Sequence, residues 1–198
     1  MSYDHPNYKD QRAAIEWARY VMRFKNRHVI LDTETTGIGN RDEIVQLAVV
    51  DLDGNTLFNE NMRPTNKKRI SEDASAVHGL TIEMLANCAI FRDFEKPLEQ
   101  AIGRKNIITY NAKFDMRMYK QTYKQAGGFL PSGEWLCAML EYAQFVGEWD
   151  EYHGNYKWHR LEGGDHTALG DCLVTLELIR SMASTVKLKK WFEFWIGK

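Results

Sequence analysis

Residues 28–35, HVILDTET, decide the fold of this chain. The apolar run at 28–32 predicts a short strand, and the acids at its end mark where that strand meets solvent. Side chains alternate between the two faces of a strand, so Asp32 and Glu34 lie on the same face. Two neighbouring anions repel each other. The pair therefore indicates a cation site or, in the simpler interpretation, a solvated strand end.

Two more strands extend this first one into a sheet. Residues 43–51 form a second run of β-favouring residues, and the loop 37–42 joins it to the first strand. Asp53-Gly54 is a turn signal before a third extended run at 56–59, which predicts a hairpin. The first three strands are therefore expected to form an antiparallel meander.

Helices and strands alternate through the rest of the chain. Apolar spacing predicts a helix over 11–24, and capping residues predict further helices over 71–77, from Thr81, over 113–125 and over 167–182. Residues 106–110 are typical of a fourth strand, and 135–145 of a buried strand or short helix. This pattern predicts an α/β or α+β domain with a mixed central sheet flanked by helices, which suits a ribonuclease H-like fold.

The composition is that of an ordinary globular domain. The 198 residues are 44% hydrophobic and 27% charged, which is enough for one buried core. Cys88, Cys137 and Cys172 are odd in number and far apart, so neither a disulfide framework nor a zinc site is expected. No targeting segment or membrane span is found, and we expect a cytoplasmic protein. A net charge of −1 argues against a protein that coats nucleic acid through overall positive charge.

Further ligand and acid–base residues follow other predicted element ends. Asp115 comes shortly after the fourth strand, near the first turn of the next helix, where the helix dipole also favours an acid. His166 and Asp171 are five apart at the start of the last helix, after a Gly163-Gly164 pair that permits a flexible loop. Taken alone, each of these residues has an ordinary structural interpretation.

The joint pattern resembles the DEDDh exonuclease family. The three motifs of that family are matched in order and approximate spacing by Asp32-Thr-Glu34, Asn111-Ala-Lys-Phe-Asp115 and His166-Thr-Ala-Leu-Gly-Asp171. The family includes the proofreading subunit of bacterial replicative polymerases, ribonuclease T and oligoribonuclease-like enzymes. The resemblance covers residues 27–183, and it implies a metal-dependent 3′-to-5′ exonuclease that releases nucleoside 5′-monophosphates.

The resemblance also implies which residues contact the terminal nucleotide. The stretch 73–81 is similar to the family's substrate loop, in which His78 and Leu80 meet this nucleotide. Asp73 stands in that loop where the family often has glutamate. The other expected substrate contacts lie in the motifs and are Thr33, Thr35, Thr36, Asn111 and Phe114. Such groups suit hydrogen bonds to a nucleotide or stacking on its base.

The expected mechanism uses two ions, Mg²⁺ or Mn²⁺. Phosphodiester hydrolysis needs a nucleophile near neutral pH and charge stabilisation on the entering and leaving oxygens, and two ions about 4 Å apart supply both. In our hypothesis Asp32 bridges the two ions. Glu34 and Asp171 complete one site, and Asp115 supports the other. An imidazole titrates near pH ~6.5, so His166 is expected to act as the general base.

Basic residues gather in three groups, at 66–69, on the predicted helix 113–125 and at 157–160. Most of them are interpreted as solvated faces. The last group mixes charge with Tyr152, Tyr156 and Trp158. It is expected either to guide a single strand by stacking and phosphate contacts or to cover the core.

We divide the chain into a helical extension (1–26), an exonuclease domain (27–184) and a basic, aromatic tail (185–198). The tail is expected to pack on the N-terminal helix or on a second chain. The expected substrates are single-stranded nucleic acid or duplex 3′ ends, of DNA or RNA. A polymerase or a second copy of this chain is a further candidate partner, and no membrane association is expected. Two alternatives stay open: a catalytically silent binding module, and an enzyme that acts chiefly on RNA.

Overall fold

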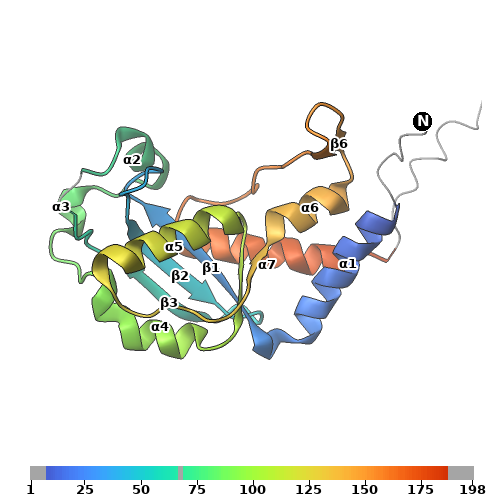
Figure 1. The fold of residues 1–198 in the computed structure, drawn as a ribbon. Coiled ribbons are helices and arrows are strands. Elements are labelled where there is room, and N and C mark those ends of the chain that lie inside the picture. Colours follow the sequence, from blue (N-terminus) through green and yellow to red (C-terminus); the bar gives the residue numbers. More distant parts are fainter. Residues whose placement is uncertain (1–7, 67–68, 187–198) are drawn as a thin grey trace, which may run out of the picture.

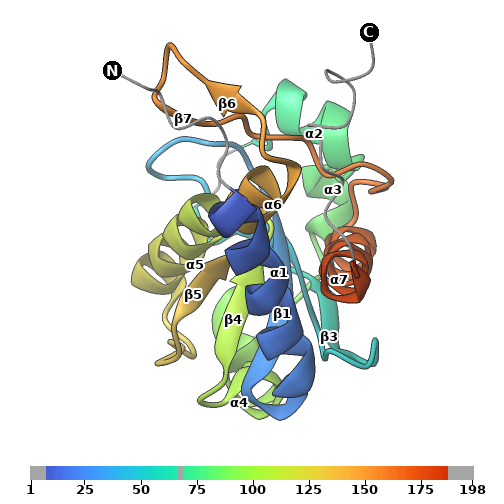
Figure 2. The ribbon, with the colours of Figure 1, turned by 90° about the vertical axis from the view of Figure 1, so that its right-hand side faces the viewer.

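The computed structural model describes residues 8–66 and 69–186. They form a five-stranded central sheet with helices on both faces, and a small two-stranded hairpin at one end (Figures 1 and 2). The α/β architecture with a mixed sheet is confirmed. The packing predicted for the tail falls largely on residues 187–198, which lie outside the described residues, and the division of the chain at 26 and 184 stays a prediction.

Strand β1 (His28–Thr35) lies at the centre of the sheet, whose strand order is β3-β2-β1-β4-β5. It pairs antiparallel with β2 (Ile44–Val50), and β2 pairs antiparallel with β3 (Thr56–Asn61). The predicted meander is therefore confirmed. The central strand is longer than the predicted run 28–32, because its polar end continues the ladder with β2 as far as Thr35.

The other side of β1 carries the parallel part of the sheet. Strand β4 (Asn106–Thr109) pairs parallel with β1, and β5 (Trp135–Cys137) pairs parallel with β4. The β1–β4 ladder ends at Ile30, opposite Ile108, so the acidic end of β1 extends past its parallel neighbour. This extension leaves the carboxyl end of β1 accessible to side chains from helices later in the chain.

The two faces of the sheet are covered by different helices, because side chains alternate along each strand. Leu31 of β1 packs in the core cluster with α4 (Glu95–Ile102) and α5 (Ala112–Ala126). The neighbouring Ile30 packs in the opposite cluster with α1 (Tyr8–Arg23) and α7 (Ala168–Ser184).

Shorter elements complete the fold. Helices α2 (Glu72–His78) and α3 (Ile82–Leu85) follow β3, and α6 (Ala138–Val146) follows β5 directly. The small hairpin consists of β6 (Trp149–Asp150) and β7 (Asn155–Tyr156). Two 3-10 helices lie at Lys25–Arg27 and Phe91–Phe94.

The local sequence signals are mostly confirmed. Ser71, Thr81 and Thr167 each cap a helix by accepting a backbone hydrogen bond from the residue three positions later. Residues 135–145, predicted as a strand or a helix, contain both. Helix α4 was not predicted, although Pro97 in its first turn is compatible with a helix because that turn needs no amide donor.

The three cysteines are free, as expected, with Cys172 buried and the other two half-buried. Within the described part of the chain, no helix is both long enough and apolar enough to cross a bilayer.

Candidate active site

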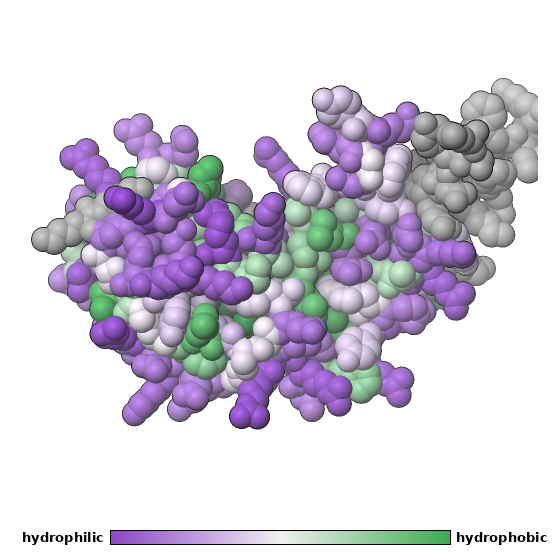
Figure 3. All heavy atoms as spheres, viewed as in Figure 1, coloured by the Kyte–Doolittle hydropathy of each residue, from purple (hydrophilic) through white to green (hydrophobic). Residues whose placement is uncertain are grey.

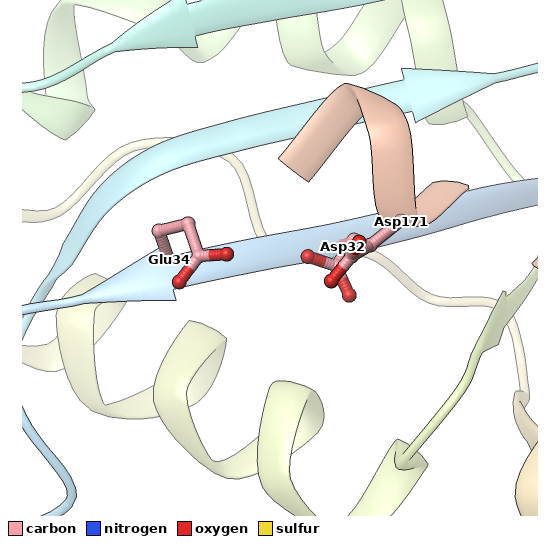
Figure 4. A group of neighbouring side chains, drawn as sticks. All are labelled: Asp32, Glu34 and Asp171. Atoms are coloured by element: carbon pink, nitrogen blue, oxygen red, sulfur yellow. The ribbon is translucent and has the colours of Figure 1, made fainter. Parts of the chain in front are cut away.

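Three carboxylates meet at the polar end of β1. Asp32 and Glu34 project from one face of this strand, as the alternation predicted, and Asp171 reaches toward them from the first turn of α7 (Figure 4). One oxygen from each of the three lies within 4.8 Å of the others. Residues 139 positions apart in the chain thus form one group of oxygen ligands.

Helix α7 is held in place by contacts at its first turn. The backbone N–H of Ala168 donates to Oε1 of Gln46 at 2.8 Å, and Gln46 lies directly opposite Glu34 in the β1–β2 ladder. The Thr167 hydroxyl accepts from the N–H of Gly170 at 3.0 Å. Both bonds fix the helix start, and Asp171 follows immediately. Gln46 therefore positions a ligand without being one.

Asp115 reaches the same end of the sheet from the first turn of α5. Its carboxylate is buried and accepts a hydrogen bond from the Thr33 hydroxyl at 2.8 Å. Thr33 lies between Asp32 and Glu34 in the sequence, so it faces the opposite side of β1, where α5 packs. The group of three closest carboxylates does not include Asp115, but Asp115 is near enough to repel the charge of Asp32.

The pKa values of the carboxylates are all raised, chiefly by burial. Burial, followed by repulsion from Asp115 and Asp171, raises the pKa of Asp32. Burial and repulsion from Asp171 and Asp115 raise the pKa of Glu34 to about 8. Burial likewise raises the pKa of Asp115 to about 7, against the opposing hydrogen bond from Thr33. Without a positive charge, the folded protein therefore favours protonated acids at this site.

Asp171 supplies an independent sign of a missing partner. Its Oδ1 is buried and has no hydrogen-bond partner among residues 8–66 and 69–186, although a buried polar atom normally has one. Burial raises the pKa of Asp171, and the charge that His166 can carry opposes this rise. Oxygen-only ligands, mutual repulsion and an unpartnered oxygen fit a hard divalent cation such as Mg²⁺ or Mn²⁺.

Glycine is required beside Asp171. A Cβ atom built on Gly164 would lie 2.2 Å from Oδ1 of Asp171, so any side chain at this position would displace the carboxylate. The second glycine of the Gly163-Gly164 pair thus makes room for the ligand. The sequence suggested only flexibility here.

His166 lies in the segment just before α7. Its side chain is exposed, and its backbone has φ of 58°, the left-handed conformation that residues other than glycine rarely adopt. The neighbouring Asp165 accepts hydrogen bonds from the N–H and the hydroxyl of Thr167, which tighten this turn. The turn therefore presents His166 to solvent at the mouth of the site, next to Asp171.

The predicted substrate residues after Glu34 hold the loop that follows β1. The Thr35 hydroxyl donates to the carbonyl of Gly37 at 2.9 Å, and the Thr36 hydroxyl donates to Asp42 at 2.9 Å. Both threonines are buried. Their hydroxyl protons are used within the loop, and the N–H and the carbonyl of Thr36 are bonded to Glu43 and Ser71.

The stretch 73–81 is tied to the end of β1 by His78. Nδ1 of His78 accepts from the N–H of Leu80 at 3.0 Å, so the proton of the neutral ring lies on Nε2, which donates to the carbonyl of Thr35 at 3.1 Å. Leu80 is buried in a small apolar cluster with Val45 and Leu85. The loop is thus next to the site, as predicted, although most of the Leu80 side chain is covered.

The remaining predicted contacts flank this region. Asp73 is exposed in the first turn of α2, and Asn111 is exposed at the start of α5. Phe114 is half-buried, and the Arg117 guanidinium lies 5.4 Å from its ring centroid. Asn111 and Phe114 are therefore close to Asp115 in the same first turn, whereas nothing in the structure ties Asp73 to the carboxylates.

Sequence reasoning missed Gln46 and the steric role of Gly164. Gln46 left a signal, since it is a polar residue within the apolar strand IVQLAVV. The sequence around Gly164 gave no sign of its steric role, because the contact with Asp171 forms only in the folded chain.

Comparisons with known proteins agree with this geometry. A family model described as an exonuclease of the RNase T type matches residues 29–179. The exonuclease CP81 of Escherichia phage 186 is 35% identical over 172 residues, covering 78% of this chain and 87% of the phage protein. A PolC-type DNA polymerase III of Staphylococcus aureus is 27% identical over 149 residues, which cover 74% of this chain but only 10% of the polymerase.

Solved structures show the same fold. Exonuclease X, in complex with 5′ overhanging duplex DNA, is 26% identical with a TM-score of 0.55, and the match covers 78% of this chain and 90% of that one. The nuclease domain of 3′hExo, a DEDDh family member bound to rAMP, is 15% identical with a TM-score of 0.57, covering 80% and 92%. The chain therefore belongs to the RNase T exonuclease family and is a nuclease.

Proposed function

We propose that this nuclease removes nucleotides one at a time from the 3′ end of a nucleic acid strand and releases nucleoside 5′-monophosphates. The observation that carries the proposal is the convergence of Asp32, Glu34 and Asp171, with oxygens within 4.8 Å and one of them unpartnered. Its similarity to Exonuclease X, which was solved on duplex DNA, supports nucleic acid as the substrate.

Asp32, Glu34 and Asp171 would hold divalent cations, and Asp115 would support them from α5. When bound, two such ions supply a nucleophile at neutral pH and charge stabilisation for the entering and leaving oxygens. The protein contributes rigid placement, because its ligands lie on a central strand and on two packed helices. The raised pKa values of Glu34 and Asp115 mean that a bound cation would shift both side chains toward their charged forms at neutral pH.

His166 would act as the general base that takes a proton from the attacking water. Its position supports this role, because an exposed imidazole beside Asp171 can exchange its proton with solvent after each turnover. A general base contributes roughly 10²- to 10⁴-fold to a rate. His166 is thus assigned to proton transfer and the four acids to metal binding.

The terminal nucleotide would lie between the loop after β1 and the first turn of α5. The amide of Asn111 would hydrogen-bond the nucleotide, and Phe114 would stack on a base. The carbonyls of Thr35 and Thr36 already accept bonds from His78 and Ser71, so each would offer only its second lone pair. The 27% identity to a PolC-type polymerase makes a polymerase complex a further candidate assembly.

The deciding experiment incubates the pure protein and Mg²⁺ or Mn²⁺ with end-labelled DNA and RNA, in single- and double-stranded forms. We expect stepwise loss from the 3′ end, with mononucleotide products. An inverted nucleotide at the 3′ end should suppress degradation, whereas the same block at the 5′ end should not.

Cleavage of a circular strand would contradict an exonuclease, and absence of any hydrolysis would favour a silent binding module. A rate on RNA far above that on DNA would identify the enzyme that acts chiefly on RNA.

A further inference from the structure

Helix α5 carries a row of four cations, Lys113, Arg117, Lys120 and Lys124, which we call the α5 ridge. Their spacing of four, three and four residues places them on one face of the helix. Three of the four side chains are exposed, and Arg117 is half-buried beside Phe114. Figure 3 shows hydrophilic side chains over this part of the surface. The ridge points away from the sheet, on the side opposite the buried residues Met118 and Thr122.

The ridge is unusual in its uniform charge. An ordinary solvated helix face mixes both signs, whereas Asp115, the sole acid in α5, is buried and faces the sheet. None of the four cations forms an ion pair with residues 8–66 or 69–186. The concentration of positive charge is therefore local in a chain with a net charge of −1.

This arrangement lowers the stability of the helix itself. Like charges three or four residues apart repel each other, and the ridge contains three such pairs in succession. Lys113 also lies in the first turn, where the helix dipole disfavours a cation. An anion on the ridge would reverse both effects, because it would neutralise the repulsion and meet the positive end of the dipole.

The ridge begins at the end of α5 that carries Asp115. Lys113 lies between Asn111 and Asp115 in the first turn of α5, and the row extends about 16 Å along the helix from there. Asp115 faces the sheet and the ridge faces away from it, so a strand whose 3′ end reaches Asp115 would pass over the start of α5 and then continue along a line of cations. Phosphates repeat along a strand, so their chemistry matches a row better than it matches a single pocket.

We propose that the α5 ridge binds the phosphodiester backbone of the substrate, on the 5′ side of the nucleotide being removed. The inference rests on the proposed function, since it places the 3′ end among the carboxylates. Because the contacts are to phosphate, the ridge would favour long strands over short ones without reading their sequence.

The test uses the triple variant K113Q/K120Q/K124Q of the full chain. Arg117 is left in place because it contacts Phe114. Affinity is measured by fluorescence anisotropy at several salt concentrations, with a single strand whose terminal linkage is a phosphorothioate that resists hydrolysis. We expect affinity to fall on the order of 10²-fold at about 50 mM salt, and the slope of log affinity against log salt to become shallower by about 2.

A matched control removes the same charge elsewhere. Arg12, Lys96 and Arg104 are exposed; Arg12 lies on α1, and the other two lie on and just after α4, away from the polar end of β1 (Figure 1). The variant R12Q/K96Q/R104Q should keep the parent's slope and affinity. Glutamine retains helix propensity, so both triple variants should melt at or above the parent temperature.

A second substrate separates the ridge from the chemistry. The p-nitrophenyl ester of thymidine 5′-monophosphate contains one nucleotide and cannot reach Lys120, so the ridge variant should hydrolyse it at the parent's rate. Failure of the parent itself on this ester and on every strand would refute the proposed function. An unchanged salt slope in the ridge variant would refute the ridge alone. A slope change with duplexes and not with single strands would also overturn the proposal as stated, because the backbone on the ridge would then be that of the complementary strand.

Discussion

The four carboxylates lie on a strand and two helices, whereas His166 lies in an exposed turn. Asp32 lies on the central strand of the sheet, and Asp115 is buried at 3% exposure. His166 lies outside any helix or strand, exposed and with a strained backbone. Ligands for cations must keep their geometry through every turnover, and rigid elements provide this. A group that passes protons to water benefits from contact with solvent. The predictions that follow test this division of roles.

The largest effect is expected from Asp32→Asn, which removes the charge nearest the centre of the cluster. Activity should fall by roughly 10⁴-fold or more, because several kcal/mol of charge stabilisation depend on the bound ions. Mn²⁺ affinity, measured by calorimetry, should fall with it. The metal-free variant should nevertheless melt at a higher temperature than the parent, since repulsion is relieved. Glu99→Gln, an exposed change on α4, is the control. Retained Mn²⁺ affinity in Asp32→Asn would contradict the assignment.

His166→Ala should fail in a different way. We expect a loss of about 10²- to 10³-fold in rate, with Mn²⁺ affinity and melting temperature close to those of the parent. The parent's rise in rate as the imidazole deprotonates should disappear from the variant. Rates from acidic to neutral pH, measured beside calorimetric titrations, test this. A variant that keeps the parent's pH profile and near-normal rate would show that His166 is not the base.

The stability of the metal-free protein should depend on pH in an unusual direction. Glu34, with a pKa of about 8, and Asp115, with a pKa of about 7, hold protons in the folded state that the unfolded chain releases near pH 4. Their contribution is complete below about pH 4 and is lost as pH rises toward 8, so stability falls with rising pH. The melting temperature should drop by several degrees across this window.

Two controls sharpen the pH prediction. Saturating Mn²⁺ should flatten the profile, because the ion then stabilises the charged carboxylates. The double variant E34Q/D115N should make it shallower without metal, with the buried Asp32 left as the remaining source of the fall. A parent profile that rises between pH 5 and 8 in the absence of metal would show that repulsion among these acids does not dominate.

The smallest effect is expected from Thr33→Val, which removes the hydrogen bond to Asp115. The change should cost about 1 kcal/mol in the free energy of unfolding and reduce activity less than tenfold, because Asp115 stays in place but loses its orienting partner. The same substitution at exposed Thr56 on β3 is the matched control. Thr33→Val and Asp115→Asn should be non-additive. Additive effects would mean that Thr33 acts independently.

The sequence was most informative where the signal was local. The period of two placed Asp32 and Glu34 on one face, and the caps at Ser71 and Thr167 located two helix starts. Helix α4 was missed because it is short and polar outside its three buried residues, Leu98, Ala101 and Ile102. The stretch 135–145 was ambiguous because an apolar run of that length suits a strand or a helix equally.

The contacts that complete the site were beyond local reasoning. Thr33 and Asp115 are 82 positions apart, and Ala168 and Gln46 are 122 apart. No periodicity reports such pairs. The motif resemblance named Asp32, Glu34 and Asp171, which the structure brings together. It did not indicate that the Thr35 and Thr36 hydroxyls hold their own loop, or that His78 bonds the Thr35 carbonyl. A sequence motif can indicate which residues lie together, but the packed structure determines which of their atoms still lack a hydrogen-bond partner.

The separation of the ligands along the chain also sets when the enzyme can first act. Asp171 follows Asp32 by 139 positions, so translation at about 5–20 residues per second makes them roughly 7 to 28 s apart. Until α7 emerges and docks on β1, the growing chain has a sheet with an incomplete set of ligands. A nascent chain thus has the complete set of carboxylates only once α7 has packed on the sheet, after most of the chain has been made.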